Sequence, residues 1–209
     1  MSDRASIGLG ESMLEVLTTG VQTPDELLVR RAREGDGAAC AELFRRHRSD
    51  SYRLAYRHLG HEQDALDVVQ EAMLKAFSGL RDFDGRSGFR TWLLKIVLHT
   101  AFDWGRRRKR RPSFPVGDYR PDDSREPTVE PDPASRLHRQ DLRQALDQAM
   151  GRLSPTIRET FILFAELGLS YKEIAEVQDV PIGTVMSRIH AARGKLQADL
   201  DWDRLNGLT

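Results

Sequence analysis

The sequence predicts an all-α protein of two small helical domains joined by a flexible linker. Apolar residues recur at three- and four-residue spacing over 24–111 and 134–203, and no stretch alternates apolar and polar residues as a strand would. Between them, residues 112–133 hold six prolines and six acids with almost no apolar periodicity, which is typical of a tether. The length of 209 residues suits two small domains. Residues 1–23 are expected to be a poorly ordered extension and 204–209 a short tail.

Composition and charge narrow the classes of function. Acids and bases balance at 32 each, yet residues 106–111 are six consecutive bases, a pattern that attracts phosphate. The single cysteine, Cys40, excludes a disulfide framework within the chain and indicates a reducing compartment. The chain opens without a basic leader and apolar core, and no apolar run approaches about eighteen residues, so we expect a cytoplasmic protein without membrane insertion. His58 and His61 have no accompanying carboxylate constellation, so we predict no metal and no cofactor.

Local signals define the first two helices. Thr23, Pro24 and Glu26 supply an N-cap, a first-turn proline and a glutamate, which predicts a helix that ends near Gly35. Residues 37–59 continue the helical spacing of apolar positions. The two amphipathic helices are expected to bury their apolar faces against the helices that follow.

Two further helices complete the first domain, with a loop between them. The helix over 61–80 is expected to turn one broad face inward, which comprises Ala65, Val68, Val69, Ala72, Met73, Ala76 and Phe77. Residues 81–88 hold two glycines, two aspartates and a serine and are predicted to be a loop. The helix over 89–111 carries Trp92 in its apolar stripe. The basic run at 106–111 continues this packed helix and is therefore expected to be held at a fixed place.

The second domain is predicted to begin with two helices. Leucines and alanines at helical spacing mark 134–150, and Gly151 is expected to end that helix. Ser154 and Pro155 then cap and start a helix that reaches Gly168, because proline is tolerated in a first helical turn.

The last two helices are predicted to form a helix–turn–helix. Ser170 and Glu173 form a capping box, and residues 179–181 break the run, since proline has no amide donor. The second helix starts at Ile182, and its buried stripe is Val185, Ile189, Ala192 and Leu196. It carries bases and no acid before Asp199. This pattern is typical of a pair of helices that reads duplex DNA.

Four motifs in this order resemble the bacterial extracytoplasmic-function (ECF) sigma factors of the sigma-70 family. They are DALDVVQEAMLKAF at 64–77, FRTWLLKIVLHTAFDWGRRRKRR at 89–111, LSPTIRETFIL at 153–163 and YKEIAEVQDVPIGTVMSRIHAARGKL at 171–196. The resemblance implies that 24–111 is sigma region 2, which binds core RNA polymerase and recognises and melts the downstream promoter element. It implies that 134–203 is region 4, which reads the upstream element.

The resemblance also assigns residues in the first domain. Asp67, Gln70 and Glu71 correspond to the face that docks on the clamp helices of the polymerase beta-prime subunit. The loop and the helix after it correspond to the surface that binds promoter DNA, which comprises Phe83, Asp84, Arg86, Ser87, Arg90, Lys95, His99, Arg106, Arg107 and Arg108. His99 stands where the family often has asparagine, which changes the base contact available there.

In the second domain the family reads DNA with the helix from Ile182. The residues that correspond to its contacts are Thr184, Ser187, Arg188, His190 and Arg193. Met186 and Ala191 stand where many relatives carry bases, so this helix is expected to depend less on phosphate charge or to read a different sequence. Phe161 and Phe164 border the surface that grips the beta flap tip, and burial within the domain explains them equally well.

The sequence therefore predicts a transcription initiation factor with no catalytic residues, whose partners are core RNA polymerase, promoter DNA and an anti-sigma factor. Promoter opening would be driven by tighter binding of melted than of closed DNA. The alternative is a dimeric helix–turn–helix regulator, which would protect two symmetric half-sites. An enzyme ranks third, because no phosphate-cradling loop or metal-ligand spacing is present.

Overall fold

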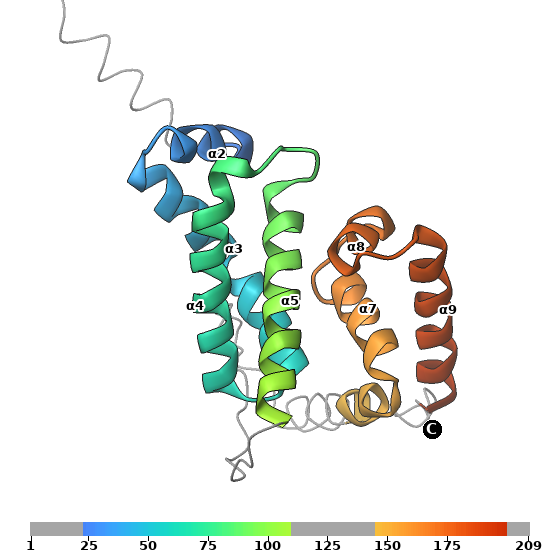
Figure 1. The fold of residues 1–209 in the computed structure, drawn as a ribbon. Helices are drawn as coiled ribbons and strands as arrows, with labels where there is room; N and C mark the ends of the chain where they lie inside the picture. The colour runs from blue at the N-terminus through green and yellow to red at the C-terminus, as the bar shows by residue number, and fades with distance from the viewer. Residues whose placement is uncertain (1–22, 110–144, 200–209) are drawn as a thin grey trace, which may run out of the picture.

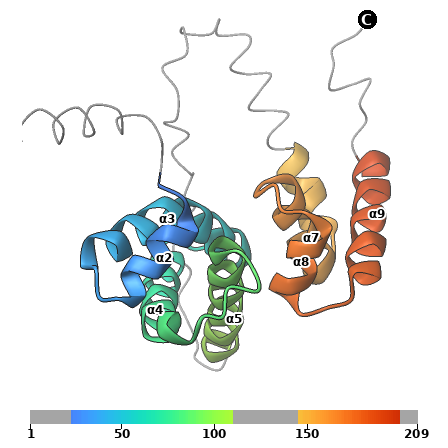
Figure 2. The same cartoon turned by 90° about the horizontal axis from the view of Figure 1, so that it is seen from above.

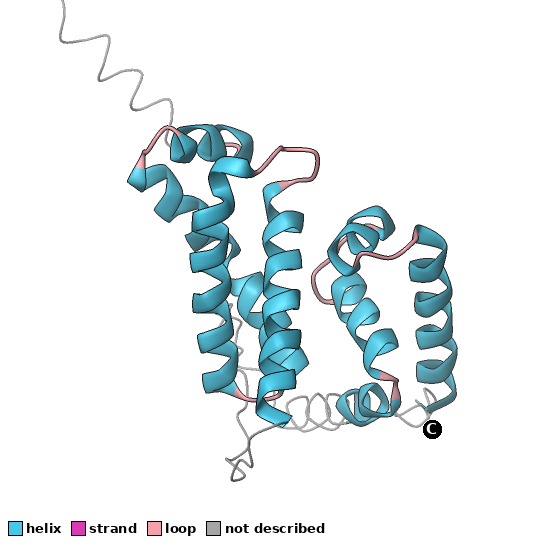
Figure 3. Cartoon of the chain, in the orientation of Figure 1, coloured by secondary structure: helices cyan, strands magenta, loops and turns pink. Residues whose placement is uncertain are grey.

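The computed structural model describes residues 23–109 and 145–199, and every regular element in them is helical (Figure 3). The predicted all-α class is confirmed over these residues. The helices of the first group are α2 (Asp25–Arg33), α3 (Gly37–Leu59), α4 (Glu62–Gly79), the 3-10 turn η1 (Leu80–Asp82) and α5 (Phe89–Lys109). Those of the second are a helical segment over 145–152, α7 (Pro155–Ala165), α8 (Tyr171–Gln178) and α9 (Ile182–Asp199). The predicted extension at 1–22, the linker at 112–133 and the tail at 204–209 lie outside the described residues.

In the first group, α3, α4 and α5 pack lengthwise around an apolar core, and α2 lies at the end where α4 passes into the loop before α5 (Figures 1 and 2). Leu43, Leu54, Val68, Leu93 and Leu94 are fully buried there. The helical periodicity of the sequence thus positions the core as predicted. Gly60 ends α3 in the left-handed conformation at φ 67°, where glycine carries no Cβ penalty.

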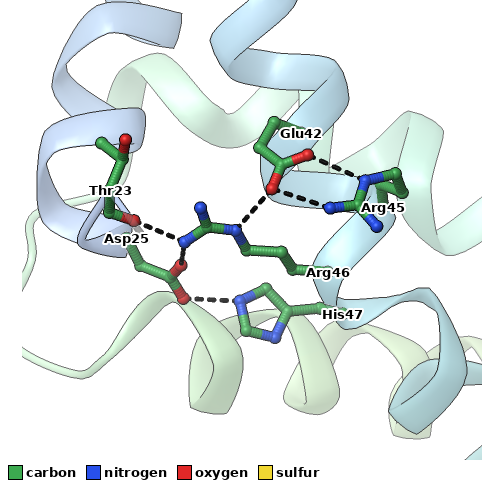
Figure 4. A network of polar contacts seen from close by, with 6 residues as sticks. All are labelled: Thr23, Asp25, Glu42, Arg45, Arg46 and His47. Atoms are coloured by element: carbon green, nitrogen blue, oxygen red, sulfur yellow. Dashed lines mark hydrogen bonds and ion pairs between the residues drawn. The ribbon is translucent and has the colours of Figure 1, made fainter. Parts of the chain in front are cut away.

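A polar network fixes α2 to α3 (Figure 4). Asp25 accepts a hydrogen bond from Arg46 at 3.2 Å and its other carboxylate oxygen lies 2.5 Å from Nε2 of His47. Glu42 accepts from Arg45 and Arg46, and these donors lower its pKa from 4.5 to about 2. The prediction of Thr23 as N-cap was wrong by one position, because Pro24 takes that place. The carbonyl of Thr23 instead accepts from Arg46.

His58 and His61 have structural partners that the sequence left open. His61 caps α4, since its Nδ1 accepts from the amide of Asp64 at 3.3 Å. His58 packs edge-on against Phe102 at 4.5 Å between ring centroids and lies 3.4 Å from a carboxylate oxygen of Glu159.

The helix–turn–helix has the predicted local chemistry. Both halves of the Ser170–Glu173 capping box are present, and Asp179 ends α8 in the left-handed conformation at φ 56°. The stripe predicted for α9 is buried in full. Gly151 does not end its helix as predicted, because helical backbone continues through Arg152. The new helix α7 begins only at Pro155.

Candidate nucleic-acid interface

The helix α5 presents one outward stripe of polar residues. Lys95, His99 and Arg106 follow one another at three to four residues per step or a multiple of it, so they share a face. The C-terminal half of α5 borders a shallow hollow lined by His99, Phe102, Asp103 and Arg106. His99 is exposed there. Lys95 is half-buried, whereas His99 and Arg106 are exposed, so the C-terminal half of this stripe is the part that is open to a ligand.

The arginines at the end of α5 are each paired with an acid of the same domain. Arg106 pairs with Asp103, Arg107 with Glu71 at 3.4 Å, and Arg108 with Asp64. The sequence shows six consecutive bases; the previous turn of α5 supplies Asp103, and the tertiary fold brings Glu71 and Asp64 from α4. The side chains of Arg106 and Arg107 are 72% and 60% exposed, and exposed ion pairs are weak, so phosphate can compete for these two guanidinium groups.

Arg90 and Lys95 are held by residues far away in the sequence. Arg90 donates to Asp50 at 2.8 Å and to the backbone carbonyl of Leu167 at 2.6 Å. Lys95 lies 3.6 Å from a carboxylate oxygen of Asp179. Both side chains are assigned to promoter binding by the resemblance, and both face the second domain in this structure.

The loop over 83–88 is a compact turn with its polar groups outward. Asp84 accepts from the amide of Arg86 at 3.0 Å and from its guanidinium at 2.5 Å. These bonds, the backbone one first, lower the pKa of Asp84. Gly85 has φ 73°, a conformation that favours glycine. Asp84 and Arg86 are exposed and Ser87 is half-buried, so the loop offers charged groups and backbone to a ligand.

Phe83 departs from its predicted place at the DNA surface. Its side chain is only 6% exposed and packs against Trp92 at 4.9 Å and Phe89 at 6.2 Å between centroids. Arg33 donates to its carbonyl at 3.3 Å. The ring anchors the loop from below, because an aromatic side chain gains most by burial. Trp92 is partly buried and packs against the apolar core, as its place in the apolar stripe predicted.

The acidic face of α4 is formed as its spacing predicts. Gln70 is exposed, while Asp67 and Glu71 are half-buried on the same side of the helix. Asp67 accepts from Gln63 at 3.4 Å, and Glu71 lies 2.7 Å from Lys75. The hydrogen bond from Lys75 lowers the pKa of Glu71, so this face stays negatively charged.

Beside this acidic face lie apolar side chains that the sequence did not assign to it. Leu66, Leu74 and Phe77 are 36%, 62% and 61% exposed. The prediction that Phe77 faces inward was wrong, because Ala76 takes the buried position at that turn. The four-, four- and three-residue steps from Leu66 through Gln70 and Leu74 to Phe77 would have revealed a continuous outer stripe. Exposed apolar side chains next to polar ones are typical of a protein-binding surface.

The recognition helix α9 carries its predicted contact residues on open surface. Ser187, His190 and Arg193 are exposed, while Thr184 and Arg188 are half-buried. The guanidinium of Arg193 lies 5.1 Å from the centre of the Phe164 ring. Ile182 and Met186 are also exposed, at 50% and 53%, and were not among the predicted contacts.

A buried carboxylate behind α9 positions one of these side chains. Glu159 is only 7% exposed and accepts from the amide of Gln178 at 2.6 Å. The oxygen of the same amide accepts from Arg188 at 3.2 Å and from Thr160 at 2.9 Å. These bonds fix the Gln178 amide, and the fixed amide oxygen in turn holds the Arg188 guanidinium in one position. Sequence spacing gave no signal for this relay.

The described residues contain neither a membrane-spanning helix nor a metal-binding cluster. In the described ranges, no helix combines the length and apolar character needed to span a bilayer. Among the same residues, no group of three or more His, Cys, Asp and Glu is placed to hold a metal ion.

Comparison with known proteins agrees with this arrangement. The chain matches the family description Sigma-70 region 2 over residues 43–111 and Sigma-70, region 4 over 143–196. It is 32% identical to the ECF RNA polymerase sigma-E factor of Haemophilus influenzae, over 84% of this chain and 95% of that protein. It is 36% identical to the ECF RNA polymerase sigma factor SigE of Mycolicibacterium smegmatis, over 78% of this chain and 63% of that protein.

A solved structure shares both the fold and part of the sequence. The structure of CnrH in complex with the cytosolic domain of CnrY superimposes with a TM-score of 0.60 at 31% identity, covering 86% of this chain and 98% of that chain. Both family regions thus occur here in the expected order, each on the helices described above. The chain belongs to the ECF sigma factors of the sigma-70 family.

Proposed function

We propose that this protein is a transcription initiation factor that binds core RNA polymerase in the bacterial cytoplasm and directs it to specific promoters. The observation that carries the proposal is the presence of two separate surfaces in one chain of this family. The face of α4 offers Gln70, Leu74 and Phe77 to a protein, and α9 offers Ser187 and Arg193 to duplex DNA. The protein itself performs no reaction, and the polymerase supplies the active centre.

The two domains would divide the work. Region 4 would read the upstream element as intact duplex through α9, with Arg188 and Arg193 suited to bidentate contacts with guanine. In region 2 the loop over 83–88 would receive an unpaired base, and the stripe of α5 would contact the adjoining phosphates. Because only strand-separated DNA can occupy the loop, binding favours the open promoter over the closed one.

A protein inhibitor is the third proposed partner. CnrH was solved with the cytosolic domain of another protein bound to it, which supports a similar partner for this chain. An anti-sigma factor that covers the exposed apolar stripe of α4 would compete with core polymerase for the same side chains.

The test is in vitro transcription from a pool of genomic fragments with purified core polymerase, followed by mapping of the start sites. We expect initiation at a defined set of sites only when the protein is added, and footprints on two unlike elements that require core polymerase. Symmetric footprints without polymerase, or no specific initiation by this protein with its host core, would contradict the proposal.

A further inference from the structure

Two large apolar side chains lie uncovered near the start of the recognition helix. Ile182 and Met186 on α9 are 50% and 53% exposed. The packing of α9 against α7 and α8 is supplied by its buried stripe, which begins with Val185 and Ile189. Ile182 and Met186 therefore stand apart from the core of the second domain, and their apolar surface faces solvent.

These two side chains share one face of α9. They are four residues apart, so they stand one above the other at a separation of about 6 Å along the helix axis. Exposed polar residues adjoin them, with Ser187 next in sequence and His190 one turn further on. In Figures 1 and 2, α9 lies on the far side of α7 and α8 from α5. Ile182 and Met186 thus form a small apolar patch on an otherwise polar, open helix face.

The charges and the position of this apolar patch favour DNA as its partner. Residues 182–198 contain Arg188, Arg193 and Lys195 and no acid, so this helix attracts the phosphates of a duplex. In helix–turn–helix proteins the N-terminal residues of the second helix contact base edges in the major groove. The apolar patch occupies the first two turns of α9, and it therefore lies where bases rather than phosphates are met.

The two donor side chains next to Met186 in the sequence already have acceptors within the domain. The hydroxyl of Ser187 donates to the backbone carbonyl of Thr184 at 2.9 Å. The guanidinium of Arg188 donates to the amide oxygen of Gln178 at 3.2 Å. Reading of bases near Met186 consequently depends on apolar contact in addition to the remaining donors of Arg188.

The apolar group that a base pair presents in the major groove is the 5-methyl of thymine. We propose that Ile182 and Met186 read thymine methyl groups in the upstream promoter element, so that this protein selects A·T pairs where the start of α9 enters the groove. The inference deepens the proposed function and rests on it. Bases stack at about 3.4 Å, so side chains about 6 Å apart reach methyl groups up to about two base-pair steps apart. The unbranched Met186 side chain can adapt to a methyl group on either strand.

The test removes the methyl group and leaves base pairing unchanged. The upstream element is first defined by footprinting the complex of this protein with core polymerase on a promoter found by start-site mapping. Each thymine of that element is then replaced singly by uracil, and the affinity of the complex for each promoter is measured by competition. Burial of one methyl group contributes about fourfold to an affinity. We expect a loss of this size at one or two thymines and no change at the others.

Substitutions in α9 then assign each methyl group to a side chain. Met186→Ala should weaken binding of the unmodified promoter about fourfold or more and abolish the effect of uracil at one position. Ile182→Ala should do the same at a neighbouring position. Met186→Leu keeps an apolar side chain and should retain the wild-type sensitivity to uracil. The matched control is Gln197→Ala, an exposed position in the last turn of the same helix, which should also retain it.

Three results would overturn the inference. In the first, the element contains no thymine or uracil binds as well as thymine at every position, so no methyl group is read. In the second, both alanine variants keep the wild-type sensitivity to uracil, so another side chain meets the methyl groups. In the third, Met186→Ala weakens binding of core polymerase without DNA, so the patch is a protein contact.

Failure of the inference and failure of the proposed function give different results. Specific initiation by the wild type on unmodified promoters, together with any of the three results, would leave the proposed function intact. Absence of specific initiation on unmodified DNA would remove the proposed function and the inference with it.

Discussion

At the scale of single residues, local pairing decides which charged side chains are free to meet a partner. Arg106 has an acid one turn earlier in the same helix, and Arg107 meets Glu71, an acid that only the fold brings beside it. Arg188 has the opposite character, because the amide of Gln178 holds it in place for an external contact. The role of these side chains in promoter binding stays a prediction, but their surroundings explain how each would be presented.

The Glu42 network gives a prediction for acid stability. The pKa of Glu42 is lowered from 4.5 to about 2 because Arg45 and Arg46 donate to its charged form. Its contribution to the free energy of unfolding is therefore complete above its unfolded pKa and is lost as the pH falls toward the folded value. We expect the urea midpoint of the wild type to fall more steeply than that of Glu42→Gln between about pH 5 and about pH 3.

The control for this comparison is Glu26→Gln, an exposed carboxylate on α2 outside the network. Its midpoint should follow the wild-type slope. If the urea midpoints of the wild type and Glu42→Gln fall equally steeply with falling pH, the network contributes no pH-dependent stability.

At the scale of elements, α4 has one face buried in the first domain and another that is exposed and partly apolar. Val68, Ala72 and Ala76 bury one side of the helix in the first domain. Leu74 and Phe77 leave the other side partly apolar in solution, at a cost that a soluble helix face does not ordinarily carry. This arrangement is explained if a partner protein covers that side.

Replacing these two side chains should weaken core polymerase binding. Full burial of a Leu or Phe contributes about 1.5–3 kcal/mol, so the double variant Leu74→Gln/Phe77→Gln should lose about tenfold or more in affinity. Because both side chains are exposed in the free chain, circular dichroism and the urea midpoint should change little. Met186→Gln removes an apolar side chain of similar exposure from α9 and should leave polymerase affinity unchanged. Wild-type co-purification of the double variant with core polymerase would refute this role of α4.

At the scale of the whole molecule, the interface between the domains combines an apolar cluster with exposed ion pairs. The Asp179 side chain is 79% exposed and that of Arg57 is 37% exposed, so salt can reach both pairs. The apolar part does not respond to salt in this way. The balance between the two parts determines how readily the domains separate.

Salt should therefore open the wild-type chain in part. Raising NaCl from about 0.05 M to about 0.5 M shortens the screening length severalfold, so energy transfer between dyes attached at exposed positions of α2 and α9 should fall. Arg57→Glu, which has already lost its ion pairs, should respond less. Equal salt responses of the two proteins would assign the effect to pairs other than those of Arg57.

The sequence by itself determined the helices, several of their caps and the family. These follow from neighbours within about four residues: the Ser170–Glu173 box, Gly60 at the end of α3 and the buried stripe of α9 all depend on local chemistry and helical period. The family and the all-α class were predicted on this basis and are confirmed.

Tertiary structure alone decided which face of a helix is covered and by what. Phe77 points outward, whereas Phe83 points inward and packs against Phe89 and Trp92 across the loop. Glu159 meets His58 from the other domain, and Lys95 meets Asp179. Helical periodicity predicts whether a side chain is buried or exposed. The energy of its packing and pairing depends on neighbours that only the folded chain brings together.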